Sequence, residues 1–328
     1  MACWPSSGVR SDVTHILLTN DDGIEAPGLW ALVQALKSSA RLSIFAPDHN
    51  WSAAGHTKTM HKPLRVSRYS FSHRMPPISA RPGSTSEESW DDRIQAYTTT
   101  GAPSDCVALA LLGILPQKPD LVVSGINQGA NFGHDLTYSG TVAAAMEAVI
   151  FGLPAVAVSL DSADERRPAD ERRPVDERRP ADEQRPADEQ PPEDRHPHDL
   201  DFAAQVAAWV IRQVEERGLP PGTFLNVNVP GLSAGEADTR GFTGATRPAG
   251  MPVAITRLGR RVYRDVLIER QDPRGRPYYW IGGEPPSGHL DEGTDIWAVA
   301  NGYVSITPVH LDMTAHDLIP TLQDWQFQ

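Results

Sequence analysis

Short apolar runs alternate with longer apolar-rich segments along most of the chain. Because the short runs are apolar throughout and do not alternate with polar residues, we expect strands covered by helices on both faces, hence a parallel, doubly wound α/β sheet. The predicted strands are His15–Thr19, Arg41–Ala46, Gln95–Thr99, Asp120–Ser124, Pro154–Leu160 and Thr223–Val229. The predicted helices are Pro27–Ser38, Pro103–Leu115, Ser139–Phe151 and the amphipathic Asp199–Arg217.

The pattern changes from about Gly241 onward. Arg261–Glu269 and Arg276–Ile281 predict the two strands of a long hairpin around the turn at 272–275. A further strand is expected at Tyr303–Pro308, and Asp312–Gln323 is expected to contain a terminal helix. Since a long hairpin that leaves an α/β body carries exposed edges, we expect this extension to help build an oligomer.

A repeat interrupts the α/β pattern. Residues Ala163–Pro192 are five copies of a hexapeptide of the type ADERRP. Proline every six residues would cost a helix about 3 kcal/mol each time, and the unit has little apolar surface to bury. A disordered insertion is therefore expected, with a protein-binding tract as the alternative, and Arg81–Asp92 is expected to be a surface loop. The predicted organisation is an N-terminal extension (1–12), an α/β core (13–162), the insertion (163–198), the continued core (199–240) and the C-terminal extension (241–328).

Composition excludes several classes of function. The formal charge is −12, from 30 basic and 42 acidic residues, which argues against non-specific binding to nucleic acid or to a membrane surface. No lysine stands in a GxxxxGK[ST] motif, so a P-loop is not supported. Two cysteines give no disulfide framework. Neither the N-terminal residues nor the interrupted apolar stretch Val142–Leu160 predicts export or a membrane span, so a cytoplasmic protein is expected.

The first predicted strand ends in two adjacent carboxylates, Asp21 and Asp22. In open α/β sheets, ligands bind beyond the carboxyl ends of the strands. Neighbouring carboxylates repel each other unless a cation lies beside them, and a hard divalent metal ion is the simplest partner. The alternative is an Asp-rich turn that caps the following helix.

A second group of polar residues follows the strand at Asp120–Ser124. The segment Ser124–Gly133 is predicted to be a loop whose glycines allow close approach to a ligand and whose asparagines offer oxygen ligands or amide donors. Ser139, Gly140 and Thr141 then open a helix, whose free N–H groups can hold a phosphate. Ordinary N-capping by Ser139 is the alternative. Metal and phosphate together suggest phosphoryl-group chemistry.

These residues resemble the SurE (survival protein E) family of metal-dependent 5′/3′-nucleotidases. The matching blocks follow the family's order along nearly the whole chain: ILLTNDDGIEAPGL (16–29), APDHNWSAAGH (46–56), YTTTGAPSDCVALAL (97–111), LVVSGINQGANFGHDLTYSGTVAAAMEA (121–148), LPAVAVS (153–159), NVNVP (226–230) and GYVSITPVH (302–310). The hexapeptide insertion and the residues at 81–92 depart from the family. Many relatives have histidine where this chain has Tyr138, so no histidine role is carried over.

The resemblance implies a Rossmann-like body with a C-terminal extension exchanged between the subunits of a homodimer or homotetramer. It implies nucleoside 5′- and 3′-monophosphates as substrates, short polyphosphate for some members, and one divalent ion per subunit: Mg²⁺ or Mn²⁺, with Co²⁺ as a further candidate. By the same resemblance, Asp21, Asp22, Ser52 and Asn127 would bind the metal. Asn131, Ser139, Gly140 and Thr141 would hold the phosphate.

The expected mechanism is in-line attack on phosphorus by a metal-activated water, which one aspartate, preferably Asp22, orients or deprotonates. An aspartyl-phosphate phosphatase of the haloacid-dehalogenase type would need a DxDx[TV] motif, whereas the carboxylates here are adjacent. A non-catalytic nucleotide or metal sensor on the same fold is the second alternative. The intact set of candidate ligands argues against it.

Overall fold

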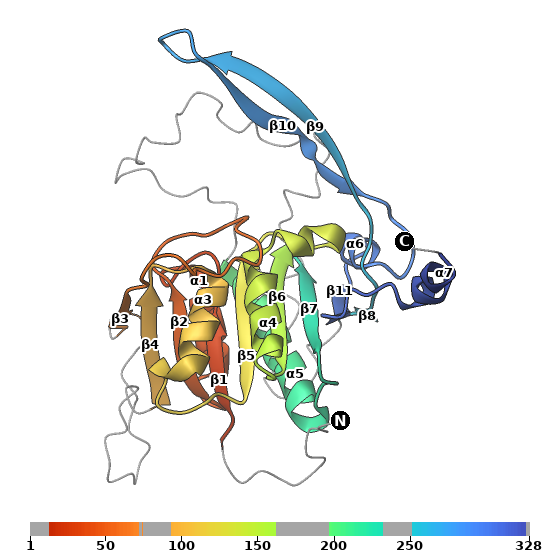
Figure 1. Ribbon diagram of the computed structural model, residues 1–328. Coiled ribbons are helices and arrows are strands. Elements are labelled where there is room, and N and C mark those ends of the chain that lie inside the picture. The colour runs from red at the N-terminus through yellow and green to blue at the C-terminus, as the bar shows by residue number, and fades with distance from the viewer. Residues whose placement is uncertain (1–12, 72–73, 75–92, 162–196, 232–250, 326–328) are drawn as a thin grey trace, which may run out of the picture.

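The computed structural model describes residues 13–71, 74, 93–161, 197–231 and 251–325. In these residues the chain forms a nine-stranded sheet of order β3-β4-β2-β1-β5-β6-β7-β11-β8 and a separate two-stranded hairpin (Figure 1). The six strands from β4 to β7 in this order all run parallel to one another. At the edges, β3 and β11 run antiparallel to β4 and β7, and β8 pairs with β11 in parallel. The sheet is therefore mostly parallel, as predicted.

The sheet strands are β1 (His15–Thr19), β2 (Arg41–Pro47), β3 (Val66–Arg68), β4 (Ile94–Thr99), β5 (Leu121–Gln128), β6 (Ala155–Asp161), β7 (Thr223–Pro230), β8 (Val253–Ile255) and β11 (Val304–His310). The hairpin consists of β9 (Arg261–Gln271) and β10 (Pro277–Gly288). The α-helices are α1 (Pro27–Leu36), α3 (Pro103–Leu109), α4 (Gly140–Ile150), α5 (Pro197–Arg217), α6 (Asp295–Ala300) and α7 (Ile319–Gln323). Shorter helical segments are η2 (Ala110–Ile114), η3 (Gly133–Thr137) and η4 (His316–Leu318).

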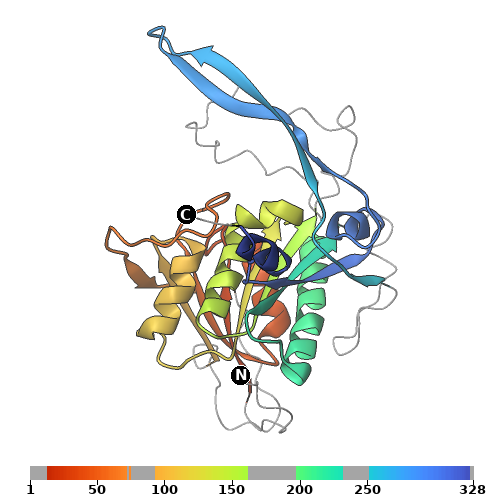
Figure 2. The same ribbon diagram turned by 45° about the vertical axis from the view of Figure 1, so that its right-hand side comes forward.

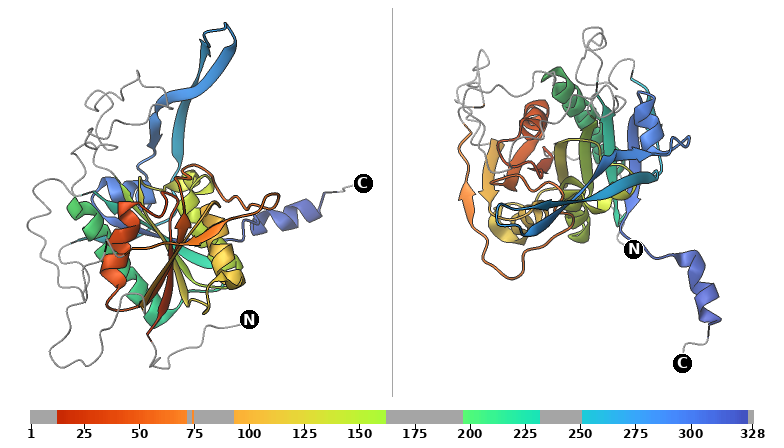
Figure 3. Two further views of the ribbon diagram at one scale, coloured as in Figure 1. Left: turned by 90° about the vertical axis from the view of Figure 1, so that its left-hand side faces the viewer. Right: turned by 90° about the horizontal axis from the view of Figure 1, so that it is seen from above.

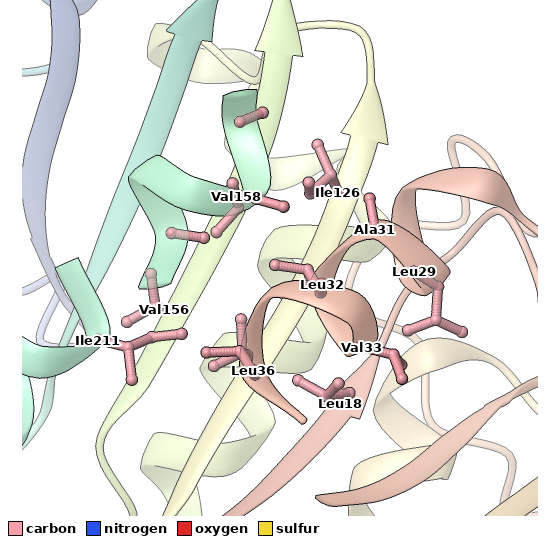
Figure 4. Close-up of a cluster of buried hydrophobic side chains, with 14 of the residues drawn as sticks. Leu18, Leu29, Ala31, Leu32, Val33, Leu36, Ile126, Val156, Val158 and Ile211 are labelled. Carbon is pink, nitrogen blue, oxygen red and sulfur yellow. The ribbon is translucent and has the colours of Figure 1, made fainter. Parts of the chain in front are cut away.

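Helices cover both faces of the sheet (Figure 2). On one face, α1 and α5 pack on the strands through a cluster that includes Leu32, Val156 and Ile211 (Figure 4). On the other face, α3 and α4 pack through Cys106, Val107 and the alanines of α4. A fully buried aliphatic side chain stabilises the fold by about 1.5–3 kcal/mol, so burial on both faces accounts for the continuously apolar strands.

The C-terminal extension leaves the body at the edge where the parallel strands end. The β9–β10 hairpin projects away from the sheet, and α7 also stands apart from the body (Figure 3). Several large apolar side chains of the hairpin are exposed, among them Leu267, Trp280 and Ile281. The predicted hairpin is thus confirmed, with both strands longer than the sequence pattern indicated.

Two sequence-based expectations were wrong in detail. The strand predicted to end at Ser124 continues to Gln128, because an irregularity in its register allows pairing with β6 to resume at Asn127. Asn127 therefore lies in a strand and not in a loop. The helix predicted for Pro103–Leu115 keeps regular α-geometry only to Leu109, after which it widens into the π-helical η2, which contains Gly113 with φ of 122°.

Some of the predicted segments fall on residues that the structure does not describe. The N-terminal extension, the loop at 81–92 and nearly all of the hexapeptide insertion lie outside the described residues. The helix expected from Asp199 begins at Pro197. None of the helices in the described ranges has the length and hydropathy needed to cross a membrane.

Candidate active site at the carboxyl edge of the sheet

Asp21 follows β1 and is buried against the start of α4. Its carboxylate accepts a hydrogen bond of 2.5 Å from the hydroxyl of Thr141. Burial raises the pKa of Asp21, and hydrogen bonds from Thr141 and from the backbone N–H of Gly140 only partly offset that rise. The end of the first strand and the first turn of α4, far apart in sequence, thus meet at one carboxylate.

Gly140 makes this close approach possible. A Cβ atom at this position would lie 2.6 Å from the Cβ of Asp21 and 2.9 Å from its Oδ2. Such distances are far shorter than van der Waals contact, and Asp21 is held by the strand below it. The glycine of the Ser-Gly-Thr turn is therefore required by packing, a role that the sequence did not reveal.

Asp22 is linked to the loop that follows β2. The side-chain amide of Asn50 donates to Oδ1 of Asp22 at 3.1 Å, and its carbonyl oxygen accepts from the backbone N–H of Ser52 at 2.7 Å. The backbone N–H of Trp51 donates to the carbonyl oxygen of Asp21 at 2.7 Å. The backbone of Ser52 is thereby linked to Asp22 through Asn50, and a metal-binding role of its hydroxyl stays a prediction. Asn50 was missed, because only the folded loop shows that it joins Asp22 to Ser52.

Asn127 completes the predicted metal-ligand set from the neighbouring strand β5. Its side-chain amide donates to the carbonyl oxygen of Gly129 at 2.7 Å, so its own carbonyl oxygen is the atom that it can offer to a cation. Strand β5 pairs directly with β1, with Ser124 opposite Thr19. Asn127, near the end of β5, and the aspartates, just after β1, therefore lie at the same edge of the sheet.

The chemistry of these donors fits a hard divalent ion. Two carboxylates, a hydroxyl and an amide carbonyl are all oxygen ligands, which suit Mg²⁺ or Mn²⁺ better than a soft metal. In the described part of the chain, no three or more His, Cys, Asp or Glu side chains gather in a cluster suited to a metal.

Asn131 is fixed by a buried polar network. Its backbone N–H donates to Oδ1 of Asn228 at 2.8 Å, and its carbonyl oxygen accepts from the side-chain amides of Asn226 and Asn228 at 2.9 and 3.0 Å. Its own side-chain amide donates to the hydroxyl of Ser159 at 2.7 Å. These supporting residues were also missed. The signal was two asparagines at alternate positions of an otherwise apolar strand, β7.

The first turn of α4 has a double role. Ser139 caps the helix by accepting the N–H of Val142 at 3.1 Å, which confirms the capping alternative. The backbone N–H groups of Gly140 and Thr141 donate hydrogen bonds to the carboxylate of Asp21 and lower its pKa. A phosphate held at this turn would therefore share those donors with Asp21.

A buried acid ties the loop after β2 to α4. Glu147 accepts hydrogen bonds from His56 at 3.0 Å and from Lys58 at 2.7 Å. Burial alone would raise the pKa of Glu147, but these two partners outweigh it and lower the pKa. The backbone N–H of Gly55 also donates to the carbonyl oxygen of Tyr138 at 3.0 Å. The loop that carries Asn50 and Ser52 is thus fastened beside the Ser-Gly-Thr turn.

Comparison with known proteins supports the sequence resemblance. Residues 16–265 match the family described as "Survival protein SurE". The chain is 43% identical over 316 residues to "5'-nucleotidase SurE" of Chloroflexus aggregans, covering 96% of this chain and 100% of the relative. It is 41% identical over 312 residues to "5'-nucleotidase SurE 1" of Thermus thermophilus, covering 94% of this chain and 96% of that relative.

A solved structure agrees in fold. The SurE protein of Aquifex aeolicus is similar with a TM-score of 0.63 and 33% identity, over 94% of this chain and 98% of that one. The predicted family and fold class are therefore confirmed. The chain belongs to the survival protein SurE family.

Proposed function

We propose that the protein is a metal-dependent phosphomonoesterase that hydrolyses nucleoside 5′- and 3′-monophosphates to nucleoside and phosphate, with short polyphosphate as a further substrate. The contact between Asp21 and Thr141 carries this proposal, because it joins a pair of carboxylates to a helix N-terminus. Such a pair suits a cation, and such a terminus suits a phosphate. The names of the relatives point to nucleotides as the phosphate donors.

The proposed metal ligands are Asp21, Asp22, Ser52 and Asn127. When bound, a divalent ion supplies Lewis-acid polarisation of a phosphoryl oxygen and lowers the pKa of water. Asp21 already accepts hydrogen bonds from the α4 turn, so it is suited to a fixed role as a ligand. Asp22 is only half-buried, and we assign it the additional role of orienting the attacking water and accepting its proton.

The chain's own donors stabilise the charge that spreads over the phosphoryl oxygens during in-line attack. We assign this role to Asn131 and to Ser139, Gly140 and Thr141 at the first turn of α4. The network of Asn226, Asn228 and Ser159 supports it by fixing the backbone and side chain of Asn131. Donors fixed in advance need no reorganisation at the moment of reaction.

The exposed apolar side chains of the hairpin support a homodimer or homotetramer. Leu267 and Ile281 are 67% and 82% exposed, and these two residues are paired across the hairpin. A contiguous apolar surface of this kind is typical of a protein–protein contact. Light scattering of the purified protein would test this, and a strictly monomeric mass would contradict it.

The test of function is phosphate release from a panel of nucleoside 5′- and 3′-monophosphates. It is measured before EDTA, after EDTA, and after Mg²⁺, Mn²⁺ or Co²⁺ is restored. We expect release that EDTA abolishes and a divalent ion restores. Absence of EDTA-sensitive release from every nucleotide would overturn the proposal. Tight nucleotide binding without release in saturating Mn²⁺ would identify a sensor instead.

A further inference from the structure

The segment Phe132–Tyr138 connects two positions to which we assign phosphate binding, Asn131 and Ser139. It contains η3 and is held on one side by the buried network around Asn131 and on the other by α4. On its remaining side it meets the root of the hairpin, the residues at and just before the start of β9.

Asp295 is the first link at this junction. It is fully buried at the start of α6 and belongs neither to the hairpin nor to the phosphate turn. Its Oδ2 accepts the backbone N–H of Gly133 at 2.8 Å, and its Oδ1 accepts the backbone N–H of Gly259 at 2.7 Å. One carboxylate therefore holds the beginning of η3 and the residue that leads into β9.

Asp135 is the second link. Its Oδ2 accepts a hydrogen bond of 2.7 Å from the Nε of Arg261, the first residue of β9, and both side chains are less than one-fifth exposed. The hydroxyl of Tyr263 donates to the other oxygen of Asp135. A largely buried ion pair of this kind fixes the relative position of its two elements more firmly than a surface pair does.

Direct packing reinforces both links. A Cβ atom at Gly133 would lie 2.3 Å from the carbonyl oxygen of Gly259, so the two backbones touch there. Phe132 packs with Ile296 and Val299 of α6 in a small cluster of its own, and the guanidinium of Arg261 lies 5.8 Å from the centre of its ring. The root of the hairpin thus shares one small packed unit with the segment between the two phosphate-binding positions.

We propose that the hairpin root sets the geometry of the phosphate site, with Asp135, Arg261 and Asp295 acting as positioning residues that do not touch the substrate. This inference rests on the proposed function, since it concerns the affinity of that site for phosphate. The proposed metal ligands follow β1, lie on β5 or lie in the loop after β2, whereas the junction contacts η3. Disturbing the junction should therefore weaken phosphate binding and leave metal binding intact.

The primary variant is Arg261→Met, which keeps an unbranched apolar side chain and removes the guanidinium and its charge. Arg261→Lys keeps the charge, and Arg274→Met makes the same charge change in the exposed turn at the far end of the hairpin. Asp135→Asn removes the charge of the other partner of the same ion pair with almost no change of shape. It serves as the second variant if Arg261→Met fails to fold. Inorganic phosphate binding is measured by calorimetry in saturating Mn²⁺, Mn²⁺ binding by electron paramagnetic resonance, and KM and kcat with a nucleoside monophosphate.

We expect Arg261→Met and Asp135→Asn to weaken phosphate binding and raise KM about three- to tenfold, with kcat and the Kd for Mn²⁺ within about twofold of wild type. Arg261→Lys should restore most of the phosphate affinity, and Arg274→Met should match wild type. Unchanged phosphate binding in the folded variants among Arg261→Met and Asp135→Asn would overturn the proposal. So would a parallel loss of Mn²⁺ affinity, which indicates general loosening. The calorimetry needs no turnover. An inactive wild-type protein would therefore overturn the proposed function, while the phosphate-binding measurements would still test the positioning role of the hairpin root.

Discussion

The hydroxyl of Thr141 donates a 2.5 Å hydrogen bond to Oδ1 of Asp21, across 120 positions of sequence. Both groups are buried, and the bond joins the carboxyl end of the interior strand β1 to the amino end of α4. A hydrogen bond to a charged group contributes about 1.5–3 kcal/mol. This contact therefore fixes the position of Asp21 and holds the candidate metal and phosphate subsites next to each other.

Thr141→Val removes the hydroxyl while keeping the shape of the side chain. Asp21 then loses its side-chain donor, and we expect kcat/KM for a nucleoside monophosphate in Mn²⁺ to fall about 10- to 100-fold. Thr141→Ser keeps a hydroxyl and should stay within about threefold of wild type. Wild-type turnover by the valine variant would show that this bond does not order the catalytic carboxylate.

Gly140→Ala tests the packing of α4 against Asp21. The added Cβ would lie 2.6 Å from the Cβ of Asp21, so either the helix or the carboxylate must shift. Since a misplacement of about 1 Å at a reacting centre can cost about 100-fold in rate, a loss of that order is expected in kcat/KM. The control is Gly152→Asn at the other end of α4, where nothing lies within 4 Å of an added Cβ. Equal activities of the two variants would contradict this reading.

Asn228→Asp tests the support of Asn131. Asn228 is fully buried and both donates to and accepts from the backbone of Asn131. The aspartate cannot donate to that carbonyl oxygen, so we expect KM to rise about tenfold and the free energy of unfolding to fall by about 1–3 kcal/mol. Asn301→Asp, an exposed asparagine that donates to the carbonyl oxygen of Trp297, serves as the control. A normal KM in Asn228→Asp would show that the network around Asn131 does not support the proposed phosphate site.

Glu147→Gln tests the tie between the loop after β2 and α4. The folded state lowers the pKa of Glu147 below its ordinary value of 4.5, so the charged form stabilises the fold above that pH. At pH 7 the variant should be less stable by about 1–2 kcal/mol, and the difference should shrink as the pH falls below 4.5 and Glu147 takes up a proton.

Denaturant unfolding from pH 7 down to about pH 3 measures this difference, since the lowered pKa places the loss below pH 4.5. Glu216→Gln, near the end of α5, serves as the control for the same chemical change. A stability difference that grows on acidification would mean that the pKa shift has the opposite sign.

The buried strands and the positions of the aspartates could be predicted from the sequence. A strand covered on both faces needs a run of apolar residues without alternation, and β1, β5 and β6 each contain one, so the parallel, doubly wound class of the sheet follows from general rules. The turn at 20–23 after β1 then falls at the edge where ligands bind. The hairpin was predictable for a different reason: the pattern of its two strands and the turn between them are local features of the sequence.

The supporting residues could not be predicted, because their roles exist only in the folded chain. Asn50 stands in a polar loop and Asp295 in a short helix, and neither has a local pattern that sets it apart. Glu147 resembles an ordinary helical acid until His56 and Lys58 are seen beside it. Likewise, the continuation of β5 to Asn127 depends on a register irregularity with β6 that no local preference encodes.

The most direct test of the central claim compares wild type with Asp21→Asn and Asp22→Asn after removal of metal by EDTA. Mn²⁺ is titrated into each protein, bound metal is measured by electron paramagnetic resonance, and phosphate release from a nucleoside monophosphate is followed in the same samples. Loss of even an outer partner of a metal site costs about 10- to 100-fold, so each variant should lose about 100-fold or more in Mn²⁺ affinity or turnover. Wild-type Mn²⁺-dependent turnover in both variants would contradict the account.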